Sequence, residues 1–301
     1  MIPESIEVFI GPRKLMIFDL CATVIAASWI SGIFAVEWGQ PHVKYSTTDG
    51  YFPIPEAVSE ISCMSNTPEY IFMCHDDVLN VDLYSYPDDP RVILLFDKCD
   101  NISGIRYCVI KSDVARRAEY YGLAFNYSYD DKGAYQNHTY WGIDVWCTDV
   151  LFASPGTLSE GCRCIEEGTV PQDIYVVLEN YEYTKITRYE SEVENQGFTK
   201  QGCYPGMGQH YFYKMYIDGS CDDHVGIAVI YDQGYLIGVV HGPFGTFTSK
   251  KRVWFEDPTP EGMKAVAPYA PQCFYQLGRY YGFVSFHIFI NKNPWETTCP
   301  V

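Results

Sequence analysis

The residues best suited to chemistry gather in one stretch of the chain, residues 202–238, which combines glycine, cysteine, histidine and aromatic side chains. His210 follows a glycine-rich turn and begins a strand predicted over residues 209–217. Glycine permits the positive φ angles that tight turns need, and histidine exchanges protons near neutral pH. His210 is therefore the candidate catalytic acid or base, and packing within the turn is the alternative interpretation.

Five further residues are candidates for binding a ligand beside His210. Strand alternation puts Tyr211 and Tyr213 on one face of the predicted strand and His210 on the other, and aromatic residues on both faces predict a strand that is covered on both sides. Convergence of the histidines with one of these tyrosines would form a pocket. A lone histidine on an apolar face is otherwise a core residue. The ligand-binding candidates are Met207, Tyr211, Tyr213, His241 and His287.

No cofactor is identified from the sequence, and calcium and copper are the two metals that the residue types would suit. The segments Cys74-His-Asp-Asp77 and Cys221-Asp-Asp-His224 each combine two carboxylates with a histidine, and calcium prefers oxygen donors. Met207 and Met215 would suit copper. The alternatives are solvated acidic turns beside disulfides and methionines in an apolar core. The chain has no G-x-S-x-G, H-E-x-x-H, P-loop or dinucleotide-binding motif.

The segment Cys203-Tyr-Pro-Gly-Met-Gly-Gln-His-Tyr211, with the apolar hairpin that follows it, resembles a pattern in functionally uncharacterised secreted proteins. These proteins share a Pro-Gly-Met-Gly-x-His-Tyr turn before an apolar hairpin. The resemblance covers residues 203–240 and brings no activity with it. It implies that Met207 and His210 belong to a recurring structural turn.

The N-terminal segment has the pattern of a secretory signal peptide. Arg13 and Lys14 precede an apolar run over residues 15–36 that only Asp19 interrupts, with cleavage expected after Ala35. A type II membrane anchor is the alternative, because the run is nearly long enough to span a bilayer. The signal peptide predicts a secreted, extracellular protein without stable membrane association after cleavage.

Eleven cysteines follow this segment. In an oxidising compartment they predict about five disulfides, with one thiol free or bonded to another chain. The spacing lacks the paired C-x-x-C motifs of zinc sites. Three N-x-[ST] motifs predict glycosylation at Asn101, Asn126 and Asn137. The candidate disulfide cysteines are Cys63, Cys74, Cys99, Cys108, Cys147, Cys162, Cys164, Cys203, Cys221, Cys273 and Cys299.

The composition restricts the class of partner. A net charge of −17 over 301 residues argues against nucleic acid and anionic membranes, which attract lysine and arginine. The chain contains 26 Tyr and 17 Phe, side chains that favour strands and binding surfaces. The partner expected is a small apolar or aromatic molecule, and the oligomeric state is left open.

Short apolar runs between turn-forming residues predict a mainly antiparallel β fold, sandwich or barrel-like, with one or two short helices. A hairpin is predicted at residues 226–240 around Asp232-Gln-Gly234. One helix is predicted over residues 259–267, with Thr259 as N-cap. Residues 37–68 and 191–201 are expected to be irregular. Further strands are predicted at residues 70–74, 78–86, 91–96, 104–110, 118–129, 140–146, 173–178, 182–189 and 283–290.

A glycine- and proline-rich stretch, residues 154–171, is the best internal boundary. The chain would then consist of the signal peptide (1–35), an N-terminal β-rich half (36–165) and a C-terminal β-rich half (166–301). One continuous domain is the alternative.

Three classes of function fit these features. The first is a secreted glycoprotein that binds a small apolar or aromatic molecule in a Tyr/Phe-lined pocket, because the chain is rich in aromatic residues and has no strong catalytic motif. The second is a secreted oxidoreductase of oxygenase or luciferase type that acts on a small aromatic compound, with His210 as base or metal ligand. The third is an extracellular structural or interaction protein. The sequence leaves open whether the protein is an enzyme.

Overall fold

A computed structural model describes residues 36–46, 50–61, 70–161, 163, 170–248 and 250–299. The predicted signal peptide (1–35) and the candidate disulfide cysteines Cys63, Cys162 and Cys164 lie outside the described residues. The fold is mainly β, as predicted, with two antiparallel sheets and short helices. Residues 36–301 form one compact unit. Among the described residues, none of the helices has the length and apolar character that a membrane span requires.

The first sheet takes its seven strands from both ends of this unit. The strands are β1 (Trp38–Lys44), β2 (Tyr51–Pro53), β11 (Phe198–Tyr204), β12 (Gly208–Tyr213), β13 (Ile227–Asp232), β14 (Tyr235–His241) and β15 (Phe286–Asn291). Their order is β11-β12-β13-β14-β15-β1-β2. The predicted hairpin is confirmed and forms β13 and β14. N-terminal β1 pairs with C-terminal β15, which adds β1 and β2 to the strands from the C-terminal part of the chain.

The second sheet has eight strands and comes from the middle of the chain. The strands are β3 (Ile71–Asp76), β4 (Val81–Tyr86), β5 (Asp89–Phe96), β6 (Ile102–Ile110), β7 (Gln136–Tyr140), β8 (Ile143–Leu151), β9 (Tyr175–Glu179) and β10 (Glu182–Lys185). Their order is β10-β9-β8-β6-β5-β4-β3, and β7 pairs with β8. In β4, buried Val81 and Leu83 alternate with half-buried Asp82 and Tyr84, which confirms the period-2 pattern.

Short helices occupy the connections. The helix expected near residues 259–267 is confirmed as α5, and the others were not predicted. The α-helices are α2 (Val58–Ile61), α3 (Arg116–Tyr120), α4 (Pro155–Ser159), α5 (Pro260–Val266) and α6 (Gln272–Tyr281). The 3₁₀ helices are η1 (Glu190–Gln196), η2 (Cys221–Asp223) and η3 (Pro294–Glu296).

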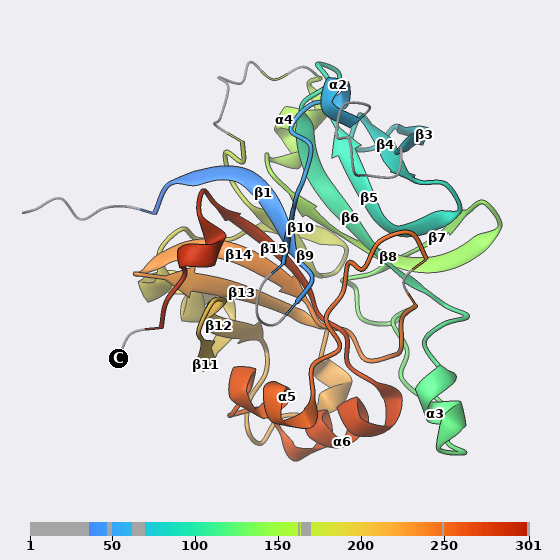
Figure 1. Cartoon of the computed structure of the whole chain (residues 1–301), viewed down its shortest axis with the longest axis vertical. Coiled ribbons are helices and arrows are strands. Elements are labelled where there is room, and N and C mark those ends of the chain that lie inside the picture. Colours follow the sequence, from blue (N-terminus) through green and yellow to red (C-terminus); the bar gives the residue numbers. More distant parts are fainter. Residues whose placement is uncertain are drawn as a thin grey trace, which may run out of the picture. The chain divides into compact units, whose positions relative to one another are not determined.

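Strand register assigns the side chains of the seven-stranded sheet to two faces. Val240 lies opposite His287 on the face that also carries His210, which we call the helix face. Helices α5 and α6 lie along this face (Figure 1). The other face, which we call the inner face, packs on the eight-stranded sheet. There the ring of His241 stacks on Tyr107 of β6 with centroids 5.2 Å apart.

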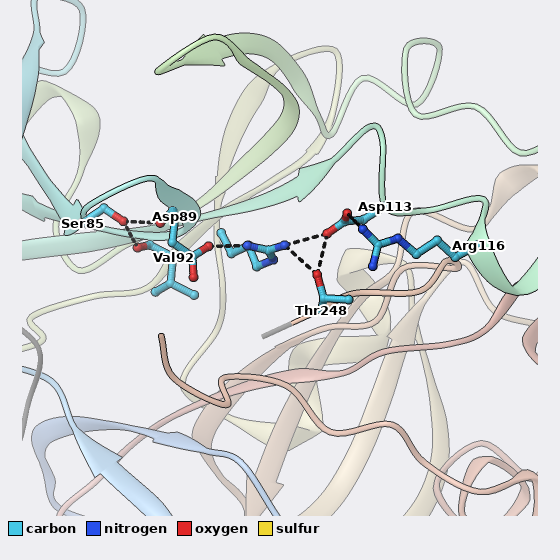
Figure 2. Close-up of polar contacts among 7 residues, drawn as sticks. Ser85, Asp89, Val92, Asp113, Arg116 and Thr248 are labelled. Atoms are coloured by element: carbon cyan, nitrogen blue, oxygen red, sulfur yellow. Dashed lines mark hydrogen bonds and ion pairs between the residues drawn. The ribbon is translucent and has the colours of Figure 1, made fainter. Parts of the chain in front are cut away.

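A buried ion-pair network joins the eight-stranded sheet to the segment after β14. Asp89 and Asp113 both pair with the Arg91 guanidinium group, at N–O distances of 2.5 and 2.6 Å. Figure 2 shows these two carboxylates on opposite sides of the network. Arg91 also donates to Thr248 Oγ1 at 3.0 Å. Arg116 pairs with the other oxygen of Asp113 at 2.8 Å. Arg91 is 1% exposed, so its charge depends on these partners.

Disulfides fix the ends of several segments. Cys108–Cys147 links directly opposed residues of β6 and β8. Cys203–Cys299 ties the C-terminal tail to β11, and Cys221–Cys273 ties η2 to α6. Cys99 is also disulfide-bonded.

The prediction of a disulfide at Cys74 is wrong. Its thiol is free and exposed on β3, an edge strand of the eight-stranded sheet. Every other cysteine that the structure describes is already paired, so none of them is available to Cys74.

Candidate functional site

A pocket of about 410 Å³ lies between α5 and the helix face of the seven-stranded sheet. It has a floor of buried side chains, each at most 5% exposed, and a rim of exposed or half-buried ones. The floor consists of Met207, His210, Phe212, Val240, Glu256, Phe283, Ser285 and His287. The rim consists of Tyr204, Asp257, Pro258, Thr259, Glu261, Gly262, Ala265 and Val266.

Two local features hold α5 over the floor. Thr259 caps the helix, because its hydroxyl oxygen accepts a hydrogen bond from the Gly262 N–H at 3.1 Å. Gly202 on β11 lets the helix contact the strand backbone, since a Cβ atom there would lie 1.9 Å from the Ala265 carbonyl oxygen. Gly202 therefore serves the packing of α5, and this helix forms one wall of the pocket.

His210 presents a hydrogen-bond acceptor. Its ring is 1% exposed, and Nδ1 lies 3.1 Å from the Gly208 carbonyl oxygen. A carbonyl only accepts, so Nδ1 carries the proton and Nε2 of the neutral ring is an acceptor. Nε2 has no hydrogen-bond partner among the described residues. Burial lowers the pKa of His210 to about 4, so the ring is neutral at physiological pH. The Gly202 carbonyl group also acts on the ring and raises its pKa, against the larger effect of burial.

Glu256 and His287 lie side by side in the floor. Glu256 forms a two-way backbone bridge with Ser285, which brings its carboxyl group to 3.5 Å from His287 Nδ1. The His287 and His210 rings are perpendicular, with centroids 6.1 Å apart.

Burial sets the protonation of this pair. It raises the pKa of Glu256 to about 7, against the opposing effect of the Lys44 charge. Burial also holds the pKa of His287 well below its usual range, and nearby His210 and Lys44 act in the same direction. The floor therefore combines neutral imidazoles with a carboxyl group that exchanges its proton near neutral pH.

The structure brings together part of the predicted site. His210, Met207 and His287 all line the pocket. Tyr211 and Tyr213 point to the inner face, as the predicted strand alternation requires. The convergence considered from the sequence therefore joins His210 with His287 alone.

Tyr211 and His241, which were also predicted to bind a ligand, contact other side chains away from the pocket. The Tyr211 hydroxyl donates to Glu190 Oε1 at 2.8 Å. His241 is buried on the inner face, where Tyr107 stacks on both His241 and its neighbour Phe286, and burial lowers the pKa of His241 to about 3. His241 thus follows the alternative interpretation of a core histidine.

Sequence reasoning missed Glu256 and the rim. Glu256 follows the short apolar run Val253–Phe255 and precedes Asp257, a pattern that is ordinary at the start of a loop and gives no local signal. The helix above it was predicted, but its placement over β12 and β15 depends on contacts distant in sequence.

Neither of the two segments considered for calcium has carboxylates gathered around a common point. Asp76 binds Arg106 at 2.9 Å, and His75 pairs with Asp82 at 2.6 Å. In the second segment, His224 is buried with Nε2 3.0 Å from the Gly242 carbonyl oxygen. Within the described parts of the chain, no three His, Cys, Asp or Glu side chains form a metal-ligand group.

The three candidate glycosylation sites differ in accessibility. Asn126 and Asn137 are exposed. Asn101 is half-buried, its amide nitrogen donates to Asp97 Oδ1 at 3.3 Å, and Ser103 of the same motif is fully buried.

Comparison with protein-family models, curated proteins and solved structures finds no significant match.

Proposed function

We propose that this protein is a secreted glycoprotein that binds a small apolar or aromatic molecule in the pocket beneath α5. One observation carries the proposal: the pocket floor contains a buried acceptor atom, His210 Nε2, without a partner in the described residues. A buried polar atom that lacks a hydrogen bond costs about 1–3 kcal/mol. A ligand that fills the pocket and donates to this nitrogen would recover that energy.

The walls of the pocket favour an apolar body. Phe212, Val240 and Phe283 are each at most 3% exposed and supply contact area in the floor. The volume of about 410 Å³ falls in the range of roughly 300–1,000 Å³ that small-molecule sites occupy. Small-molecule sites combine such apolar surface with polar groups that fix the orientation of the ligand. Here the polar groups of the floor are His210, Glu256, Ser285 and His287.

The extracellular setting is supported by covalent chemistry. Three intramolecular disulfides among the described residues are compatible with an oxidising compartment. The signal-peptide pattern at residues 1–35 and the exposed Asn126 and Asn137 agree with secretion and glycosylation.

Blocking the mouth of the pocket tests the proposal. Ala265 is exposed at the rim, so Ala265→Trp fills the entrance without changing the core. We expect aromatic alcohols and amines to raise the melting temperature of the wild-type protein and not that of the variant. Lys264→Trp is the matched control, because Lys264 is exposed on the same helix and does not line the pocket. The proposal would be contradicted if the compounds raised the melting temperature of Ala265→Trp as well. It would also be contradicted if no compound raised that of the wild type.

A further inference from the structure

The pocket has an asymmetric charge distribution. Its lining includes three carboxyl groups, Glu256 in the floor and Asp257 and Glu261 at the rim. Among the described residues that line it, there is no lysine or arginine. A ligand with a carboxylate or phosphate group would meet like charge at both depths, which disfavours its binding.

The floor offers hydrogen-bond acceptors. His210 Nε2 and Glu256 Oε1 both lack a partner among the described residues, and both residues are at most 5% exposed. Water reaches such atoms poorly, so a ligand that donates hydrogen bonds would satisfy them. The two observations are independent, since one concerns net charge and the other concerns unpaired atoms.

We infer that the pocket binds an organic amine in its protonated form, with the ammonium group at Glu256 and His210 and the apolar or aromatic body against Phe212 and Phe283. The inference rests on the proposed binding function and adds the chemical class of the ligand. An ammonium group supplies up to three N–H donors and a positive charge. A hydroxyl group supplies one donor and adds no positive charge beside the carboxylate.

Two cations, Lys44 and Arg117, act on carboxyl groups of the pocket, and neither of them lines it. Lys44 on β1 acts on Glu256 electrostatically, but it does not line the pocket. Arg117 of α3 lies 3.8 Å from Asp257 Oδ1, at the rim. The titratable and charged groups around Glu256 are His210 on β12, His287 on β15, Lys44 on β1, Asp257 beside it, Arg117 on α3 and Glu261 on α5.

Ammonium binding is coupled to the proton on Glu256. The carboxyl group must be ionised to pair with the ligand, and burial raises its pKa to about 7. Affinity for an amine should therefore fall as the pH falls below about 7, and binding near that pH should release a proton to the buffer. A neutral alcohol needs no ionised carboxylate, so its affinity should stay nearly constant over the same range.

Three probes with one aromatic body test the inference: 2-phenylethylamine, 2-phenylethanol and 3-phenylpropanoate, titrated into the full secreted chain by calorimetry. At about pH 8 we expect the amine to bind at least about tenfold more tightly than the alcohol, and the carboxylate not to bind. At about pH 6 the amine should lose roughly tenfold in affinity. Repeating the titration in buffers of different ionisation enthalpy should reveal the released proton.

Glu256→Gln separates the two proposals. This variant should abolish the preference for the amine and its pH dependence while it still binds the alcohol. The matched control Glu160→Gln removes an exposed carboxylate that does not line the pocket and should keep both. Equal or tighter binding of the alcohol by the wild type would overturn the amine inference and leave the binding function intact. Failure of both the alcohol and the amine to bind would overturn both.

Discussion

The unfavourable free energy of burying a charged group at this site falls mainly on one residue, Glu256. A carboxyl group that is 5% exposed loses most of its hydration, and the groups that act on it instead are the charge of Lys44 and the neutral imidazole of His287. Protonation reduces that cost, and the raised pKa of Glu256 expresses the balance. Buried groups held away from their usual protonation state are more common at functional sites than elsewhere.

Stability should depend on pH through Glu256. Its pKa is about 7 in the folded protein and near 4.5 in the unfolded chain, so the folded state binds the extra proton between these values. The free energy of unfolding should fall by about 3 kcal/mol as the pH rises through this window. Glu256→Gln stays neutral in both states and should not show this decline. Urea unfolding of the two proteins across the window measures the difference.

The control for this prediction is Glu261→Gln, because Glu261 is an exposed carboxylate of the same pocket. Its unfolding curve should follow the wild type at every pH. Buried His210 and His224 act in the opposite direction, since burial lowers the pKa of each to about 4 and stability is lost as the pH falls from 6.5 toward that value. A parallel pH dependence in Glu256→Gln and wild type would disprove the assignment to Glu256.

At the scale of elements, the position of α5 depends on one glycine. The Ala265 carbonyl approaches the β11 backbone so closely that no Cβ atom fits at Gly202. Gly202→Ala must therefore shift the helix, and we expect a loss of about 1–3 kcal/mol in the free energy of unfolding together with weaker ligand binding. Denaturant unfolding and the calorimetric titration measure the two effects.

Gly262→Ala is the matched control for that substitution. Gly262 lies within α5, and a Cβ atom there would make only ordinary contacts at 3.6 Å with Pro258 and Thr259. Alanine favours the helix over glycine by up to about 1 kcal/mol, so this variant should be as stable as the wild type or more stable. If Gly202→Ala were equally harmless, the helix would not depend on the close approach.

Elements with strong local signals could be predicted from the sequence. The β13–β14 hairpin has a turn glycine between apolar runs, and α5 has an N-cap threonine followed by proline. Residues 37–68 were wrongly expected to be irregular, because Pro41 sits inside β1, where a bulge between Trp38 and His42 accommodates it. The aromatic run 118–129 was wrongly predicted as a strand, and its start belongs to α3.

The candidate site residues also divide into those with a local sequence signal and those that depend on long-range contacts. His210 could be selected because glycines, cysteine and aromatics surround it within a few positions. Glu256 reaches the pocket only because its segment bridges Ser285 of the final strand region. No local pattern encodes that pairing, nor the pairing of β1 with β15 that puts Lys44 opposite His287. The periodicity of a segment shows which side chains share a face, but it does not determine which distant segment pairs with it.

At the scale of the whole molecule, the Arg91 network links segments that are distant in sequence. Because the charged groups of Arg91, Asp89 and Asp113 are buried, the stability of the fold should depend strongly on each of them. Arg91→Met should leave the buried Asp89 and Asp113 without their cation and lower the free energy of unfolding by about 3–5 kcal/mol. Arg116→Met is the control, because Arg116 is 51% exposed and its pair with Asp113 should contribute less than about 1 kcal/mol. Urea unfolding followed by tryptophan fluorescence compares the two variants. Equal losses would mean that the network does not depend on the buried arginine. A larger loss in Arg91→Met would show that the link between the eight-stranded sheet and Thr248 stabilises the fold that holds the pocket.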